Sequence, residues 1–326
     1  MRAGIIGLGH YVPEKILTNE ELADRIGMPP EGILHRTGIR ERRVARPGEA
    51  TSDMATAAAA MALKNAGVDA AEIDLTVLAT CTPDDGIAPT AAAVQARIKA
   101  GNAPAFDLGA ACSGFIYALV MAGQAISSGL YRKVLVIGAD SMTRVVDPND
   151  AQTVILFGDG AGAAVLAEVP EGYGLLAADL GSDGAGRGNI VVPAGGSRMP
   201  AAEETVANGL HYMHMEGRSV FTFALKAMGD SVLRVLDKAG LDPGAIDLFA
   251  PHQANIRIIE AAARRIDLPM EKVIVNIDRY GNTSAASVPI ALSEAAASGR
   301  IRRDDHLVMV GFGAGLTWAS CTVKWF

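Results

Sequence analysis

An internal repeat constrains the fold of this chain more than any other feature of its sequence. Residues 66–75 share the pattern Ala-Gly-x-Asp-x-x-x-Ile-Asp-Leu with residues 239–248, and the apolar run at 133–138 resembles the run at 306–311. Both pairs are separated by 173 positions, and neither needs a gap. A constant offset of this kind indicates two similar halves within one chain.

The repeat also relates the segments that carry the candidate reactive residues. The offset moves Cys112 into residues 281–287, which contain Asn282, and it moves residues 80–82 close to His252. If the two halves pack about a pseudo-two-fold axis, their matching loops converge. We therefore expect Cys112, His252 and Asn282 to share one site.

Composition narrows the class of protein. A chain of 326 residues that is 50% hydrophobic can bury one large core or two fused cores. The net charge of −7 argues against broad nucleic-acid binding. Three widely spaced cysteines indicate reduced thiols in a cytoplasmic protein and no metal-ligand motif. We see no signal-peptide pattern and no apolar run long enough to span a membrane, so we expect a cytoplasmic enzyme.

Short runs rich in Val, Ile and Leu alternate with alanine-rich helical stretches, which predicts an α/β fold. The predicted strands are residues 75–79, 134–137, 161–166, 248–250, 272–276, 307–310 and 319–323. The predicted helices are residues 53–65, 90–99, 113–127, 219–239, 257–266 and 285–297. Between the halves, a segment near 181–217 begins with many Gly and Pro residues and predicts a long surface insertion, of the kind that often forms a functional lid.

Cys112 lies between a predicted strand that ends near Asp107 and a predicted helix that begins near Ser113. The unpaired backbone N–H groups and the dipole of a helix N-terminus favour a thiolate, so we expect a nucleophilic sulfur there. The alternative is a buried structural cysteine, which is the more common role for this residue type.

His252 directly follows an apolar strand, at the carboxyl end where α/β proteins place active sites. Asn282 lies in another strand-to-helix turn, where its amide can donate a hydrogen bond to an oxyanion. The alternatives are a structural histidine and a helix-capping asparagine. The glycine-rich turn at 311–315 supplies backbone N–H groups that can form a second oxyanion hole.

Five ordered motifs carry a resemblance to a known family, and they lie at residues 36–42, 110–115, 157–163, 251–255 and 281–287. Together they resemble the thiolase-fold condensing enzymes, specifically β-ketoacyl-acyl-carrier-protein synthase III. The resemblance implies a five-layered αβαβα sandwich of two pseudo-two-fold-related halves. Residues 1–170 would carry the nucleophile, and residues 171–326 would carry the histidine and the asparagine. It also implies a homodimer.

The resemblance implies a Cys-His-Asn triad that needs no metal or redox cofactor. Cys112 would attack an acyl thioester such as acyl-CoA and hold the acyl group. His252 and Asn282 would then stabilise the enolate that forms as a malonyl thioester, on an acyl-carrier protein or on coenzyme A, loses carbon dioxide. The backbone N–H groups of Cys112 and Ala314 would hold the oxyanion of acyl transfer. The side chain of Phe312 would shield the site.

The same resemblance implies substrate contacts, and several of these depart from the family pattern. Arg36, Asn255 and Arg257 match family residues that contact coenzyme A. The family's adenine-stacking tryptophan and arginine are replaced by Gly32 and Ala151, whereas Arg218 is an additional basic residue. Ala88 stands where a phenylalanine often reaches across the dimer and limits acyl length, so we expect a roomier acyl pocket.

Two alternatives remain open at this stage. One is a relative from specialised metabolism, either an acetoacetyl-CoA synthase or an acyltransferase that uses the same triad. The other is a non-catalytic acyl-thioester binding protein, which would not require Cys, His and Asn together. The sequence leaves open the acyl donor, the carrier of the extender unit and the pathway.

Overall fold

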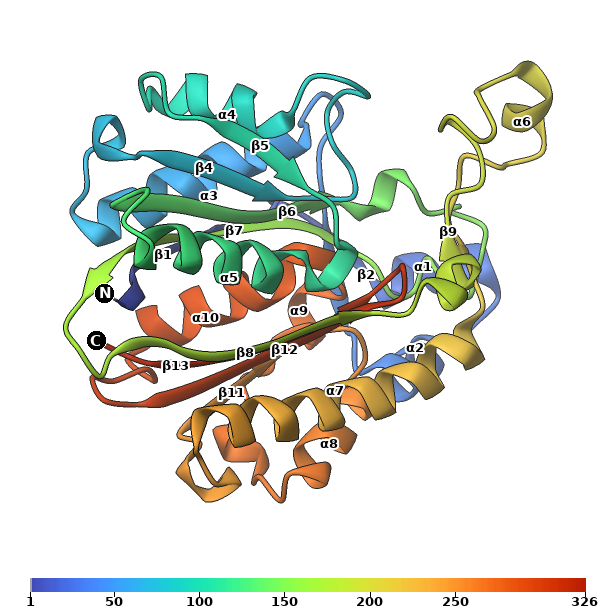
Figure 1. Cartoon of the computed structure of the whole chain (residues 1–326). Helices are drawn as coiled ribbons and strands as arrows, with labels where there is room; N and C mark the ends of the chain where they lie inside the picture. Colours follow the sequence, from blue (N-terminus) through green and yellow to red (C-terminus); the bar gives the residue numbers. More distant parts are fainter. Residues whose placement is uncertain (1) are drawn as a thin grey trace.

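The computed structural model describes residues 2–326, and Figure 1 shows five alternating layers of helices and sheets. Two sheets lie roughly parallel, with helices between them and on both outer faces. The first sheet holds five strands, in the spatial order β1 (Arg2–Tyr11), β7 (Asp159–Val169), β6 (Lys133–Ser141), β4 (Leu75–Ala79) and β5 (Ala105–Leu108). This layering is the thiolase-like sandwich that the sequence predicts.

The second sheet repeats the strand order of the first. It contains β8 (Gly174–Ser182), β13 (Thr317–Lys324), β12 (His306–Gly313) and β11 (Leu248–Pro251), which correspond to β1, β7, β6 and β4. The chain passes from one sheet to the other between Val169 and Gly174, and we retain residue 170 as our proposed division of the chain.

The second sheet lacks a full counterpart of β5, so the predicted strand at residues 272–276 is wrong. Only Val273 pairs with β11, through an isolated bridge to Phe249. Beyond it, the backbone N–H groups of Asn276 and Ile277 donate to the side-chain oxygen of Gln253, at 3.0 and 3.2 Å. A side-chain acceptor therefore replaces the strand ladder at this position.

Helices cover every face of the two sheets. The outer face of the first sheet packs against α3 (Thr51–Ala66) and α4 (Thr90–Ile98), and that of the second packs against α7 (Gly217–Ala239) and α8 (Ile256–Arg265). Between the sheets lie α5 (Gly114–Ser127) and α10 (Ser287–Ala297). The predicted helices are therefore confirmed, with ends that shift by a few residues.

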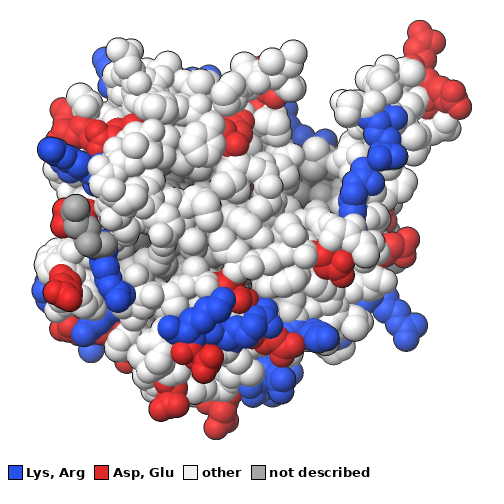
Figure 2. Space-filling view, in the orientation of Figure 1, with Lys and Arg blue, Asp and Glu red and all other residues white. Residues whose placement is uncertain are grey.

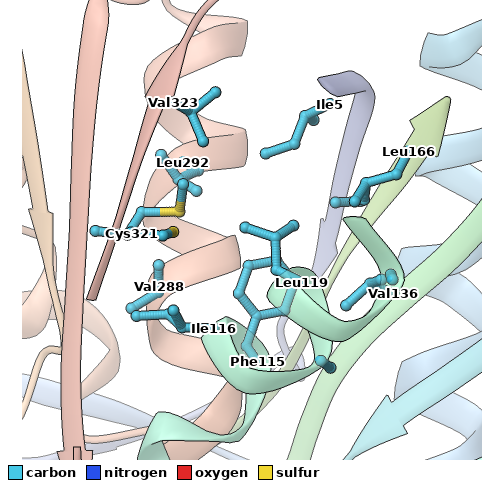
Figure 3. Packing of buried hydrophobic residues seen from close by; sticks show 14 of the residues in the cluster. Ile5, Phe115, Ile116, Leu119, Val136, Leu166, Val288, Leu292, Cys321 and Val323 are labelled. Atoms are coloured by element: carbon cyan, nitrogen blue, oxygen red, sulfur yellow. The ribbon is translucent and has the colours of Figure 1, made fainter. Parts of the chain in front are cut away.

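The central layer binds the two halves together through apolar contacts (Figure 3). Phe115 and Leu119 of α5 face Leu292 of α10, and Cys321 of β13 lies among them. All four side chains are buried, so helix α5 is fixed along its length. The residues just before this helix, which include Cys112, are thereby held against the second half.

The predicted insertion forms an arm between β8 and α7. It contains a short ribbon of β9 (Ile190–Val191) and β10 (His214–Met215), and its far end carries α6 (Glu203–Ala207). Figure 1 shows this arm extending away from the body, and Figure 2 shows acidic side chains at its end.

The remaining elements lie around the first half and the central layer. They are β2 (Lys15–Thr18), α1 (Asn19–Ile26), α2 (Pro30–Thr37), β3 (Glu41–Val44) and α9 (Ile277–Tyr280). Across residues 2–326, we find no helix with the length and apolar character that a membrane span requires.

Candidate active site

Two matching turns meet at the centre of the molecule. The 3-10 turns Ala111–Ser113 and Ser284–Ala286 occupy equivalent positions in the repeat, directly before α5 and α10. The first residue of each turn has a positive φ, 46° at Ala111 and 52° at Ser284. The Sγ of Cys112 lies 3.4 Å from the Oγ of Ser284, to which the thiol donates a hydrogen bond. The loops that the repeat predicts to converge are therefore in contact.

A cavity of about 710 Å³ opens over these turns. Cys112, His252, Asn282, Phe312 and Ala314 all line it, so the structure brings the three polar candidate residues together. The rest of the lining is mostly apolar and includes Met142, Val145, Ile155, Leu156, Val191, Met213 and Phe221. A pocket of this shape suits a long, mainly apolar group that reacts near a few polar atoms.

The thiolate character that we expected at Cys112 is not present in the resting protein. Burial of the sulfur raises the pKa of the Cys112 thiol to about 12, and the nearby carboxylate of Asp140 raises it further. The hydrogen bond with Ser284 and the backbone N–H of Cys112 oppose this rise but do not cancel it. Desolvation therefore outweighs the helix-terminal groups, and the sulfur carries its proton at neutral pH.

This pKa predicts how alkylation of Cys112 will depend on pH. Below the pKa, the thiolate fraction grows about tenfold per pH unit, so the rate of modification by iodoacetamide will rise at that slope from about pH 7 to 10. An ordinary cysteine, with a pKa of about 8.5, would level off within that range. Peptide mapping at each pH measures the rate at Cys112, and a plateau near pH 8 would contradict the raised pKa.

His252 is held in place through both its backbone and its ring. Its backbone N–H donates to the carbonyl of Val310 at 2.7 Å, and the ring packs edge-to-face on Phe312 with centroids 5.5 Å apart. Burial lowers the pKa of His252 to about 3, so the imidazole is neutral at physiological pH.

The hydroxyl of Ser287 determines which nitrogen of His252 carries the proton. The Nδ1 of His252 lies 2.6 Å from the Oγ of Ser287, and this oxygen also accepts from the backbone N–H of Gln253 at 3.4 Å. Within residues 2–326, Nδ1 is the only acceptor recorded for the Ser287 hydroxyl proton. The Ser287 hydroxyl therefore donates its proton to Nδ1, and Nδ1 carries no proton of its own. The single proton of the neutral ring is on Nε2, which leaves an N–H donor for the cavity.

Replacing Ser287 with alanine should therefore impair the reaction without removing any group that touches substrate. The ring would lose the partner that fixes its tautomer, and we expect turnover to fall about 10- to 100-fold, as when a group that orients a histidine is removed. Acylation of Cys112, followed by intact mass, should change little. Ser293→Ala, which removes another buried hydroxyl from α10, is the matched control. Equal losses in both variants would contradict this role for Ser287.

Asn282 is fixed equally firmly, and by both halves of the molecule. Its backbone N–H donates to the carbonyl of Leu156 at 2.8 Å, and its carbonyl accepts from Gly158 at 3.1 Å. Its side-chain oxygen accepts from the backbone N–H of Ser284 at 2.9 Å. Because the oxygen is occupied, the side-chain NH₂ remains as a donor beside the cavity.

The end of β12 approaches the Cys112 backbone so closely that only glycine fits at Gly313. A Cβ atom at this position would lie 2.6 Å from the backbone nitrogen of Cys112 and 2.9 Å from the Cβ of Ala111. This contact places Gly313, and with it the neighbouring Ala314, against Cys112 in the lining of the cavity.

We expect Gly313→Ala to displace the Cys112 turn. The added methyl group meets rigid backbone, and such overpacking costs about 1–3 kcal/mol in the free energy of unfolding. Acylation of Cys112 should slow at the same time, as intact mass over time will show. Gly109→Ala is the control, because its Cβ would have no heavy atom within 4 Å. Equal behaviour of the two variants would contradict the close contact.

Of the residues predicted to contact substrate, some line the cavity and others lie outside it. Arg36 and Asn255 line the cavity, but both polar groups of the Asn255 side chain already bond to protein, to the carbonyl of Arg36 and to the N–H of Arg257. Arg257 is exposed on α8 and donates to the carbonyl of His35. Arg218 and Ala88 are exposed and lie outside the cavity lining.

Four residues of the site were not predicted from the sequence: Ser284, Ser287, Cys81 and Asp140. The two serines lie inside the motif at 281–287, and the repeat offset pairs Ser284 with Ala111, but nothing in the motif indicates their hydrogen-bond partners. Asp140 is fully buried and accepts hydrogen bonds from residues 80–82 and from the backbone N–H of Ala285. It therefore links the first half to the turn of Ser284.

Comparison with known proteins identifies the family. Two family models match, 3-oxoacyl-[acyl-carrier-protein (ACP)] synthase III over residues 106–184 and the C-terminal model of the same synthase over residues 236–325. The β-ketoacyl-[acyl-carrier-protein] synthase III of Symbiobacterium thermophilum is 53% identical over 322 residues, covering 99% of this chain and 98% of its own. The chain belongs to the β-ketoacyl-acyl-carrier-protein synthase III family.

Members of this family with solved structures share the fold over their whole length. The 3-oxoacyl-(acyl carrier protein) synthase III of Pseudomonas aeruginosa has a TM-score of 0.92 and 42% identity, covering 100% of this chain and 98% of its own. The synthase III of Thermus thermophilus has a TM-score of 0.92 and 46% identity, with 99% of both chains covered. The predicted family and fold are therefore confirmed.

Proposed function

We propose that this chain catalyses a decarboxylating condensation of an acyl thioester with malonyl-acyl-carrier protein through an acyl-Cys112 intermediate. The product is a β-ketoacyl thioester, as the names of the relatives indicate. The observation that carries the proposal is the cavity in which the Cys112 thiol lies with two fixed N–H donors, from His252 and Asn282. A protein that only bound acyl thioesters would have no use for this combination.

In the first half-reaction, Cys112 takes the acyl group. A bond forms between its sulfur and the carbonyl carbon, the thioester bond of the donor breaks, and the thiol proton ends on the departing thiol. The negative charge on the carbonyl oxygen is stabilised by the backbone N–H groups of Cys112 and Ala314, two residues that line the cavity. Because the resting sulfur is protonated, loss of this proton is part of the acylation step.

In the second half-reaction, the malonyl thioester loses carbon dioxide. The electron pair of the breaking bond forms an enolate, whose oxygen accepts hydrogen bonds from the Nε2–H of His252 and the side-chain NH₂ of Asn282. A neutral imidazole suits this task, because burial keeps the pKa of His252 near 3. The enolate carbon then attacks the acyl carbonyl, the Cys112 sulfur leaves, and it takes a proton from solvent.

The region where the family clamps adenine suggests which part of the donor is recognised. Ala151 lines the cavity, whereas a side chain on Gly32 would make only ordinary contacts with Met28 and Pro29. The backbone at Gly32 therefore does not exclude a side chain, but glycine offers no ring there on which adenine could stack. We propose that the thioester and its pantetheine arm contribute more to donor binding here than the nucleotide does.

We also propose that the chain acts as a homodimer, as is typical of this family. Strand β5 lies at the edge of its sheet, and Phe106 on it is 44% exposed. The loop after β4 exposes Ile87 almost completely, beside Ala88. Figure 2 shows few charged side chains on the face that carries β5 and α5. Light scattering of the purified protein tests the assembly, and a stable monomer at micromolar concentration would refute it.

A matrix of donors and acceptors tests the reaction itself. Acyl-CoA and acyl-pantetheine are supplied as donors, and malonyl-acyl-carrier protein and malonyl-CoA as acceptors, with carbon dioxide release as the readout. We expect the highest kcat/KM with malonyl-acyl-carrier protein. A clear preference for malonyl-CoA would favour an acetoacetyl-CoA synthase instead, and acyl transfer without carbon dioxide release would favour an acyltransferase.

A further inference from the structure

A second thiol, Cys81, lines the same cavity and has no part in the proposed reaction. It lies two residues after the end of β4 and is exposed, whereas Cys321 is fully buried in β13. Within the part of the chain that the structure describes, Cys81 and Cys112 are the cysteines that face the cavity.

One hydroxyl group contacts both of these sulfur atoms. The Oγ of Ser284 lies 3.4 Å from the Sγ of Cys112 and 3.6 Å from the Sγ of Cys81. The thiol of Cys81 also donates to the carboxylate of Asp140 at 3.3 Å and lies 3.7 Å from the sulfur of Met142. The two thiols therefore flank the same hydroxyl group, that of Ser284.

The backbone also places the two cysteines within reach of one another. Cys81 follows β4 and Cys112 follows β5, and these strands are hydrogen-bonded neighbours, with Ala79 opposite Leu108. Their pairing continues to the N–H of Thr80, which donates to the carbonyl of Leu108. Neighbouring strands lie about 4.8 Å apart, so Cys81 stands beside residues 109–111, which lead directly into Cys112.

We propose that Cys81 is a second covalent site in the cavity, a resolving thiol that forms a disulfide with Cys112 when hydrogen peroxide oxidises the nucleophile. The inference rests on the proposed function in one respect only, namely that Cys112 is the sulfur that reagents in the cavity reach first. Everything else that it requires concerns the geometry of the two thiols and Ser284.

The chemistry balances with peroxide as the oxidant. The sulfur of Cys112 attacks one oxygen of hydrogen peroxide, the O–O bond breaks, and a sulfenic acid and one water form. The sulfur of Cys81 then attacks the sulfenic sulfur, the S–O bond breaks, and the departing hydroxide leaves as a second water with the Cys81 proton. The two thiols together lose two electrons, and peroxide gains them.

The disulfide would block acylation, because the nucleophilic sulfur would be bonded to Cys81. It would also protect that sulfur, since a sulfenic acid left without a partner thiol proceeds to sulfinic and sulfonic acids, which a dithiol does not reduce. A dithiol such as dithiothreitol reduces a disulfide, so inactivation through Cys81 would be reversible. The expected distinction is therefore between reversible and permanent loss of activity.

The experiment exposes the full-length protein to hydrogen peroxide and compares it with Cys81→Ser and the matched control Cys321→Ala. Although the Cys81 residue is exposed, its sulfur atom, like that of Cys112, is shielded from solvent, and this desolvation raises the pKa of both thiols. Incubation at about pH 9 therefore raises the thiolate fraction about 100-fold above its value at pH 7. One part of each sample is analysed by intact mass without alkylation, and the other part is denatured, alkylated and analysed by peptide mapping. Activity before and after dithiothreitol is normalised to each variant's own untreated value.

We expect the wild-type chain and Cys321→Ala to lose about 2 Da, to yield a peptide pair joining Cys81 to Cys112, and to regain most activity with dithiothreitol. Cys81→Ser should instead gain about 32 or 48 Da on Cys112 and regain less than about a tenth. Sulfinic acid on Cys112 of the wild-type chain, or a disulfide that involves Cys321 or two chains, would overturn the proposal.

A separate measurement keeps failure of this inference distinct from failure of the proposed function. Untreated protein is incubated with acyl-CoA, and the acyl adduct on Cys112 is measured by intact mass. An adduct without an oxidised Cys81–Cys112 pair would refute the resolving thiol alone. Absence of the adduct in protein that does form the pair would refute the proposed nucleophile alone.

Discussion

Replacing Cys112 with serine will abolish the acyl-enzyme while leaving the fold intact. The hydroxyl of serine is a far weaker acid than a thiol, and the same burial that raises the pKa of Cys112 to about 12 will suppress ionisation of an oxygen even more. The exchange of sulfur for oxygen removes little volume, and Cys112 lies outside the apolar core. Intact mass after incubation with acyl-CoA will show an acyl adduct on the wild-type chain and none on the variant.

The control for this experiment is Cys321→Ala, which removes a thiol from the core of the second sheet and leaves the cavity unchanged. Circular dichroism and thermal melting of all three proteins will show whether the fold persists. A variant at position 112 that is acylated at the normal rate would mean that another residue of the cavity accepts the acyl group, and Cys81 would be the first to examine.

The repeat in the sequence predicts the topology well because it records the positions of whole strands. The offset of 173 residues relates β4 to β11 and β6 to β12, and it relates the turns before α5 and α10. The glycines that end α3 and α7, Gly67 and Gly240, are equivalent and have nearly equal φ values of 65° and 67°. Backbone geometry of this kind leaves a direct trace in the sequence.

The repeat fails where the halves have diverged or where a side chain replaces the backbone. The missing fifth strand of the second sheet is an example, since the Gln253 side chain binds the N–H groups that a strand would have paired. Residues 272–276 are apolar enough to be a strand, and nothing in them indicates that a glutamine about twenty positions earlier takes over this task.

The electrostatic state of the site could not be predicted from motifs either. The position of Cys112 before a helix predicts a thiolate. Burial of the sulfur and the carboxylate of Asp140 oppose its ionisation, and both come from other elements of the fold. The partners of the triad have the same origin, because Ser287 contacts His252 from a helix 35 residues away in sequence. Residue types at a site can be read from a sequence, whereas their protonation depends on neighbours that only the fold assembles.

Replacing His252 or Asn282 with alanine will separate the two half-reactions. Each side chain offers one donor nitrogen to the cavity, and loss of one such donor to an oxyanion costs about 100- to 1,000-fold in rate. We expect both variants to form the acyl-enzyme on Cys112, because the backbone N–H groups that serve acylation remain. Release of carbon dioxide from malonyl-acyl-carrier protein should fall by that factor in each.

The matched control is His214→Ala, which removes an exposed histidine from β10. The double variant gives a further test, because two donors to the same oxyanion act on one charge. If both contact the enolate oxygen, the combined loss will differ from the product of the single losses, since neighbouring groups that share a partner are not additive. If His252→Ala instead fails at acylation, the imidazole must act on the Cys112 proton, and the Nε2–H tautomer that Ser287 imposes would have to be reversed in the reacting enzyme.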